Sequence, residues 1–245
     1  EGNDRKGLGL PSDQDVLIKK VLAANKNSVL VLNTGSPVSM PWIKSCPAIL
    51  QTWFPGQEFG NALAEILFGK ESPSGKLPTT YPKKLSDTPA YSCYPGKNLQ
   101  MDYKEKLLVG YKWYEKKKIE PLFPFGHGLS YSKFELKKVS LLKKKHEIKI
   151  KVKLKNIGNF STFETVQCYL ERKAVKADTP KKKLVDFKKL KVTKDKSKKL
   201  TLKVSKRDLS EWDVKKSKWE IARGDYVIHV GTSVRDISIT EEIKI

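Results

Sequence analysis

The sequence is poor in the residues that build metal clusters, disulfide networks and membrane spans. It has three cysteines and three histidines in 245 residues, all far apart, without a CxxC zinc spacing and with one thiol too many for complete pairing. It also lacks an apolar run near the ~20 residues that cross a bilayer. We therefore expect no metal, no cofactor and no membrane partner, with Cys46, Cys93 and Cys168 as free, buried thiols.

Arginine is scarce although the chain is strongly basic. The net charge is +22, yet only five of the 49 basic residues are arginine. Residues 133–245 carry 32 basic and 15 acidic side chains, whereas residues 1–132 carry 17 and 12. Specific phosphate or base recognition favours arginine forks, so we expect no nucleic-acid partner and interpret the lysines as solvated faces. A non-catalytic module that binds anionic carbohydrate or an anionic surface is the alternative.

The N-terminal third shows the pattern of an α/β layer. An apolar stripe at helical spacing includes Leu17, Val21 and Leu22, and Ser12 stands where it could cap the first turn. A continuous apolar run follows, as in a parallel strand that is buried on both faces. The predicted elements are a helix over 12–24, strands over 29–32 and 48–50, and a helix over 57–68. This order predicts the end of an α/β domain.

The rest of the chain changes character twice. Seven prolines interrupt residues 70–132, whose many aromatic residues indicate a strap packed on its neighbours rather than a free linker. From Phe134 the apolar period becomes two, and Ile148, Ile150, Val152 and Leu154 are expected to face one core. About seven short strands follow, which is typical of an immunoglobulin-like or fibronectin III-like β-sandwich.

Several long motifs carry a resemblance to a known family. They are AILQTWFPGQEFGNA at 48–62, ILFG at 66–69, PSGKLPTTYP at 73–82, VGYKWY at 109–114 and FPFGHGLSY at 123–131. Nearer the C-terminus stand Trp212-Asp213, Trp219, GDY at 224–226 and VGTS at 230–233. Together they cover nearly the whole chain, and the sequence resembles the C-terminal part of glycoside hydrolase family 3, of the β-glucosidase or β-xylosidase type.

The resemblance implies both an architecture and a chemistry. Residues 1–75 would end the family's α/β-sandwich domain, residues 76–132 would be the linker strap, and residues 133–245 would form a fibronectin type III-like domain. A (β/α)8 barrel would precede this piece and carry a nucleophilic aspartate. The expected reaction is retaining hydrolysis of a terminal β-linked glycoside, which needs two carboxylates, so the chain alone is expected to be inactive.

The opening segment resembles the part of the family that carries the acid/base residue. Glu1 is the candidate acid/base, with Asp4 and Arg5 as neighbours, and Arg5 could hold the loop by a charge-assisted bond. Residues that bind substrate cannot be assigned from this sequence. The sequon at Asn159 could be used only in a secreted protein, and we expect a secreted or extracytoplasmic location.

Overall fold

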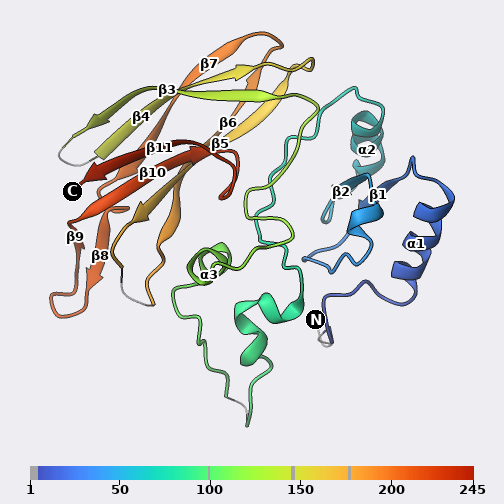
Figure 1. The fold of residues 1–245 in the computed structure, drawn as a ribbon, viewed down its shortest axis with the longest axis horizontal. Helices are drawn as coiled ribbons and strands as arrows, with labels where there is room; N and C mark the ends of the chain where they lie inside the picture. Colours follow the sequence, from blue (N-terminus) through green and yellow to red (C-terminus); the bar gives the residue numbers. More distant parts are fainter. Residues whose placement is uncertain (1–4, 99, 145–146, 176–177) are drawn as a thin grey trace.

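The computed structural model describes residues 5–98, 100–144, 147–175 and 178–245, and it confirms the mixed fold class. A small α/β part and a β-sandwich are joined by a long linker that carries the short helix α3 (Figure 1). No helix of the described chain has the length and apolar character that a membrane crossing requires.

The α/β part is built around two parallel strands. It comprises α1 (Gln14–Ala24), β1 (Val29–Leu32), the 3-10 turn η1 (Ile43–Ser45), β2 (Ala48–Gln51) and α2 (Phe59–Leu67). A cluster that includes Leu22, Leu32 and Trp42 forms its core. The predicted cap at Ser12 is wrong: Ser12 has φ +52°, and Asp13 takes the N-cap position without a capping side-chain bond. A residue at this φ lies in a turn before the helix.

Much of the predicted apolar surface in this part remains exposed. Leu17 and Val21 are 61% and 45% exposed, so only one edge of the α1 stripe, at Leu22, is buried. Phe54, in the turn after β2, and Phe68, directly after α2, are 82% and 84% exposed. Parallel sheets are normally covered on both faces. The described residues therefore cover only part of the apolar surface of this two-stranded layer.

The linker contacts both parts of the molecule. It contains the 3-10 turns η2 (Leu85–Asp87) and η3 (Pro89–Ser92) and the helix α3 (Tyr111–Lys117). Tyr81 is buried in the α/β core, whereas Tyr111 stacks on Phe125 and packs edge-on against Tyr169 of the sandwich. Lys76 forms a buried ion pair of 2.8 Å with Glu164. The linker is therefore held in place by both of its neighbours.

Two antiparallel sheets form the sandwich, and the described part of 133–245 contains nine strands rather than about seven. One sheet has the order β3-β4-β7, with bounds Phe134–Lys143, Glu147–Asn156 and Ser197–Ser205. The other has the order β11-β10-β5-β6, with bounds Ile237–Lys244, Asp225–Gly231, Thr162–Arg172 and Lys182–Val192. The additional pair is the hairpin of β8 (Ser210–Asp213) and β9 (Lys218–Ile221).

The predicted core of the sandwich is confirmed. Ile148, Ile150, Val152 and Leu154 alternate along β4, and each is at most 1% exposed. They pack with buried residues of the opposite sheet, among them Val166 and others of β5 and β10. The period-two pattern therefore identified the inner face of β4 correctly.

The cysteine prediction is correct in part. All three thiols are free, but only Cys168 is buried, while Cys46 and Cys93 are partly exposed. Burial is the main cause that raises the pKa of the Cys168 thiol to about 12. Although it is partly exposed, Cys46 packs against the core of the α/β part.

Candidate functional site

The carboxyl ends of β1 and β2 form a tightly bonded edge. The Leu32 carbonyl accepts hydrogen bonds from both the backbone N–H and the hydroxyl of Thr52, each at 2.9 Å. The Gln51 amide donates to the Thr34 carbonyl at 2.9 Å, and its oxygen accepts from the Tyr81 hydroxyl at 2.9 Å. Burial raises the pKa of Tyr81 to about 12, so this hydroxyl stays a donor at neutral pH. The two strand ends are thus fixed relative to each other.

The N-terminal segment lies on this edge. Arg5 donates from Nη1 to the Ser36 hydroxyl at 2.7 Å and from Nη2 to the Gly9 carbonyl at 3.0 Å. The Ser39 N–H donates to the Leu8 carbonyl at 2.6 Å, which fixes the segment a second time. Arg5 therefore holds this loop as expected, although its acceptors are neutral. In open α/β sheets, ligands bind at the carboxyl ends of the strands, and the loop is anchored there.

The first four residues, which include Glu1 and Asp4, lie outside the described part of the chain. The role of Glu1 as the candidate acid/base therefore stays a prediction. Arg5 is the first residue of the segment that the structure describes. Ser36 and Gln51 are participants that the sequence analysis missed. Their only signal is their place in the polar turns that directly follow two apolar strands.

Backbone strain is present at the same edge. Trp53, two residues after β2, has φ +56°, a conformation that costs a bulky side chain on the order of 1–3 kcal/mol. Its ring meets Tyr81 edge-on at 6.5 Å. A Cβ at Gly35 would lie 2.5 Å from the Phe54 ring, so the two turns pack closely. Strain of this kind clusters at functional sites, and it supports this edge as the candidate site.

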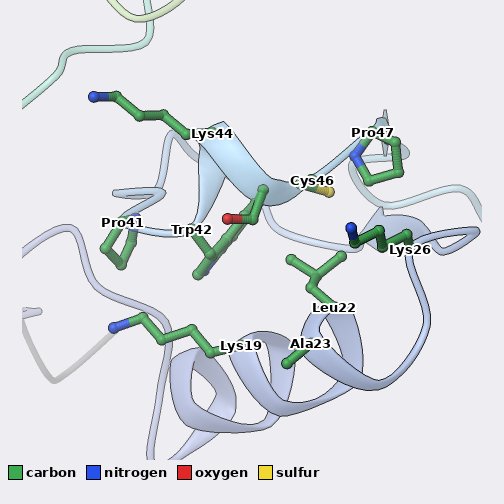
Figure 2. Close-up of a pocket in the computed structure, with 10 residues that line it drawn as sticks. Lys19, Leu22, Ala23, Lys26, Pro41, Trp42, Lys44, Cys46 and Pro47 are labelled. Atoms are coloured by element: carbon green, nitrogen blue, oxygen red, sulfur yellow. The ribbon is translucent and has the colours of Figure 1, made fainter.

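A second feature of the α/β part is an open hollow of about 710 Å³ (Figure 2). Helix α1 contributes Lys19 and Leu22, the turn after it contributes Lys26, and the facing segment contributes Trp42 and Lys44 among others. Figure 2 shows the amines of Lys19 and Lys44 directed away from the centre of this hollow. Its lining contains no carboxylate, so it does not supply the carboxylic acid/base that glycoside hydrolysis uses. Among the residues described, no cluster of possible metal ligands occurs either.

One ionisable pair lies on the outer face of the β11-β10-β5-β6 sheet. His229 Nε2 lies 2.8 Å from the Glu171 carboxylate, and both side chains are about 15% exposed. Burial lowers the pKa of His229, and this effect outweighs the hydrogen bond to Glu171. Burial favours a higher pKa for Glu171, but hydrogen bonds from Lys181 and His229 outweigh it and lower the pKa. These groups lie on β5 and β10, away from the strand ends of β1 and β2.

Comparison with known families matches nearly the same regions as the sequence motifs. The glycosyl hydrolase family 3 C-terminal domain matches residues 1–131. The fibronectin type III-like domain matches residues 164–234. The first match covers more than half of the chain, including the edge anchored by Arg5.

Similar curated proteins include β-glucosidases. Thermostable β-glucosidase B of Acetivibrio thermocellus is 41% identical over 249 residues, which covers 100% of this chain and 33% of the relative. A putative β-glucosidase of Schizosaccharomyces pombe is 40% identical, covering 98% of this chain and 29% of the relative. The chain thus spans about a third of the length of these curated relatives.

Solved structures of β-glucosidases have the same fold as this chain over its whole length. The β-glucosidase of Kluyveromyces marxianus in complex with glucose superposes with a TM-score of 0.95 at 37% identity, covering 100% of this chain and 29% of that chain. β-Glucosidase 3B of Thermotoga neapolitana in complex with glucose has a TM-score of 0.90 at 32% identity, covering 100% and 36%. With the domain match, the sequence identity and the fold in agreement, this chain belongs to glycoside hydrolase family 3.

Proposed function

We propose that this chain is the C-terminal part of a retaining β-glycosidase that hydrolyses terminal β-linked glycosides. In this proposal Glu1 is the acid/base residue, and the nucleophilic aspartate is supplied by a (β/α)8 barrel outside the chain. The single observation that carries the proposal is the full-length similarity to β-glucosidases of which the chain spans about a third. The barrel would hold the sugar and the nucleophile, so the chain by itself would not hydrolyse a glycoside.

The contacts of the N-terminal segment support the place of Glu1. Arg5 bonds to Ser36 and Gly9 at the carboxyl edge of the parallel strands, four residues after Glu1. A loop held in this way would present a carboxylate to a barrel docked against that edge. As the acid/base, Glu1 would protonate the leaving oxygen in the first step and deprotonate water in the second.

The exposed apolar side chains of α1 and β1 support a missing cover. Leu17, Val21 and Val29 are 61%, 45% and 48% exposed, although they belong to a helix and a strand of one layer. Leu17 and Val21 are neighbours one turn apart on α1, and exposed apolar side chains that lie together mark a contact with other protein. The proposal assigns this contact to the remainder of the α/β domain.

The first test measures hydrolysis. The purified chain is expected to release no nitrophenol from p-nitrophenyl β-glucoside or β-xyloside, and adding the N-terminal two thirds of the Acetivibrio thermocellus relative should restore turnover. Turnover by the chain alone would refute the claim that its catalytic centre is incomplete.

The second test addresses Glu1 in that restored enzyme. Glu1→Gln should lower kcat for p-nitrophenyl β-glucoside by about 10²–10⁴-fold, because both proton transfers are lost. Azide needs no general base, so it should restore turnover and form a glycosyl azide with retained β-configuration. Asp13→Asn, a matched loss of one carboxylate at the exposed N-cap of α1, should leave kcat unchanged. Normal kcat for Glu1→Gln would show that another residue is the acid/base.

A further inference from the structure

The outer face of the β3-β4-β7 sheet is a continuous surface of lysines. Seven lysines and two glutamates project from it; the lysines are Lys137 of β3, Lys149, Lys151, Lys153 and Lys155 of β4, and Lys199 and Lys203 of β7. We call these seven residues the lysine face. All except Lys149 belong to the exposed class. The face has no arginine and no aromatic residue among its outward positions.

The strand register places five of these lysines beside one another, whereas Lys151 lies between Ser140 and Thr201 and Lys155 lies between Glu135 and Ser197. Lys153 of β4 lies between Lys137 of β3 and Lys199 of β7, so three lysines form one row across the sheet. Lys149 lies opposite Lys203 two rows further along. Directly opposed side chains stand about 5 Å apart, and like charges at that distance destabilise a sheet. The sequence alone showed only alternation along β4, whereas the structure shows the rows.

Acidic residues do not compensate for this charge. Glu135 pairs with Lys137 at 3.1 Å, and Glu147 pairs with Lys149 at 2.8 Å. The other five members of the lysine face, Lys151, Lys153, Lys155, Lys199 and Lys203, have no ion pair within the described ranges. The pKa of Glu147 is lowered, first by its hydrogen bond from Lys149 and further by nearby charges that include Lys203. A face selected only for solubility would mix both signs.

Within the part of the chain that the structure describes, the lysine face is the uncovered side of the sandwich. The outer side of the β11-β10-β5-β6 sheet is occupied by the linker, because Tyr111 packs on Tyr169 and the Gln167 amide donates to the Gly126 carbonyl at 3.2 Å. In Figure 1 the four-stranded sheet lies between the β3-β4-β7 sheet and α3. A long polymer could therefore reach the lysine face without contacting the linker.

We infer that the lysine face binds an acidic polysaccharide, a carbohydrate polymer with repeated carboxylate or sulfate groups. Four lysines repeat about every 7 Å along β4, and two of them, Lys149 and Lys153, have lysine neighbours about 5 Å away on adjacent strands, which makes an array of point charges suited to a polyanion with regularly spaced charges. Without arginine forks the face lacks the side chain best suited to reading bases, and without aromatic residues it has no stacking platform for single-stranded nucleic acid.

The choice of a carbohydrate rests on the proposed function, because a glycosidase that binds a charged polymer stays near its glycosides. The binding itself requires no catalysis. Binding is therefore measured on the chain alone with polygalacturonate oligomers, and hydrolysis is measured separately in the restored enzyme. If the chain binds polygalacturonate but the restored enzyme hydrolyses no glycoside, only the proposed function is refuted. If the restored enzyme hydrolyses glycosides but the chain does not bind polygalacturonate, only this inference is refuted.

The test uses two triple variants with the same loss of charge. Lys151→Gln/Lys153→Gln/Lys199→Gln removes three unpaired members of the lysine face. Lys20→Gln/Lys70→Gln/Lys83→Gln removes three exposed lysines of the α/β part and linker. The face variant should bind polygalacturonate about 100-fold more weakly, at roughly tenfold or less per lysine, as expected for lysines at anionic surfaces. The control variant should change the Kd less than about twofold.

Two further readouts exclude a folding defect and the other polyanions. Removing like-charged neighbours should leave the Tm of the face variant equal or higher, so weaker binding would not reflect unfolding. The Kd for the unsubstituted chain should rise with salt, as counterion release requires. Equal losses in the two variants, absence of binding, or tighter binding to single-stranded DNA or phosphatidylserine vesicles than to polygalacturonate would overturn the inference.

Discussion

Replacing Lys76 by methionine should loosen the attachment of the linker to the sandwich. Lys76 Nζ lies 2.8 Å from the Glu164 carboxylate and donates to the Gly128 carbonyl at 2.6 Å. The two charged side chains are only 12% and 8% exposed. Removing one partner of a buried ion pair typically costs about 3–5 kcal/mol. Because Glu164 would keep the hydrogen bond from the Thr165 N–H at 2.7 Å, we expect about 3 kcal/mol.

Urea unfolding followed by circular dichroism would measure this loss in a double-mutant cycle. Lys76→Met and Glu164→Gln should each destabilise the fold, and the double variant should recover about 2 kcal/mol of coupling because it leaves no buried charge alone. Lys106→Met is the matched control, since Lys106 pairs with Asp178 at 2.6 Å while both side chains are more than 60% exposed. Its expected effect is below about 1 kcal/mol. Equal losses for Lys76→Met and Lys106→Met would contradict the reasoning.

Three further predictions follow from buried groups of the sandwich and linker. The pKa of the partly buried His229 is lowered, so the folded state binds fewer protons than the unfolded chain. The contribution of the neutral imidazole to the unfolding free energy is therefore complete above the unfolded pKa near 6.5 and is lost as pH falls through the lower folded pKa. His229→Gln should flatten the dependence of the unfolding free energy on pH between pH 7 and 5. A colorimetric thiol reagent should titrate Cys46 and Cys93 in the native chain and reach Cys168 only after denaturation, and rapid reaction of all three would contradict its burial. Gly126→Ala should lower the unfolding free energy by about 1–3 kcal/mol. Gly126 has φ +80°, and a Cβ at this position would lie 2.2 Å from the Gln167 side chain of β5. Unchanged urea unfolding would refute this close approach.

The sandwich was predictable where one face of a strand is buried. The alternation along β4 identified Ile148 and its three inward partners because the side-chain period of a strand is two. The hairpin of β8 and β9 was missed because each strand has only four residues, too few for a periodic signal. The register that aligns Lys137, Lys153 and Lys199 depends on pairing between distant segments, which alternation within one strand does not reveal.

The α/β part shows where sequence patterns are incomplete. The helices and strands were located to within about two residues, and the bond from Arg5 to the loop was anticipated. The exposure of Leu17 and Val21 was not anticipated, because an apolar stripe indicates a buried face without identifying the protein that covers it. The φ of Trp53 depends on packing of two turns and has no signal in its own residue type.

The linker carries a consequence for protein engineering. Tyr81 belongs to the core of the α/β part, whereas the Tyr111 hydroxyl accepts a hydrogen bond from the Leu184 N–H of β6 at 2.7 Å. A chimaera that exchanged only residues 133–245 would therefore pair a foreign sheet with a mismatched set of aromatic contacts. Grafting this sandwich onto another enzyme should succeed only when residues 76–132 are transferred together with it, because their side chains pack against the sandwich.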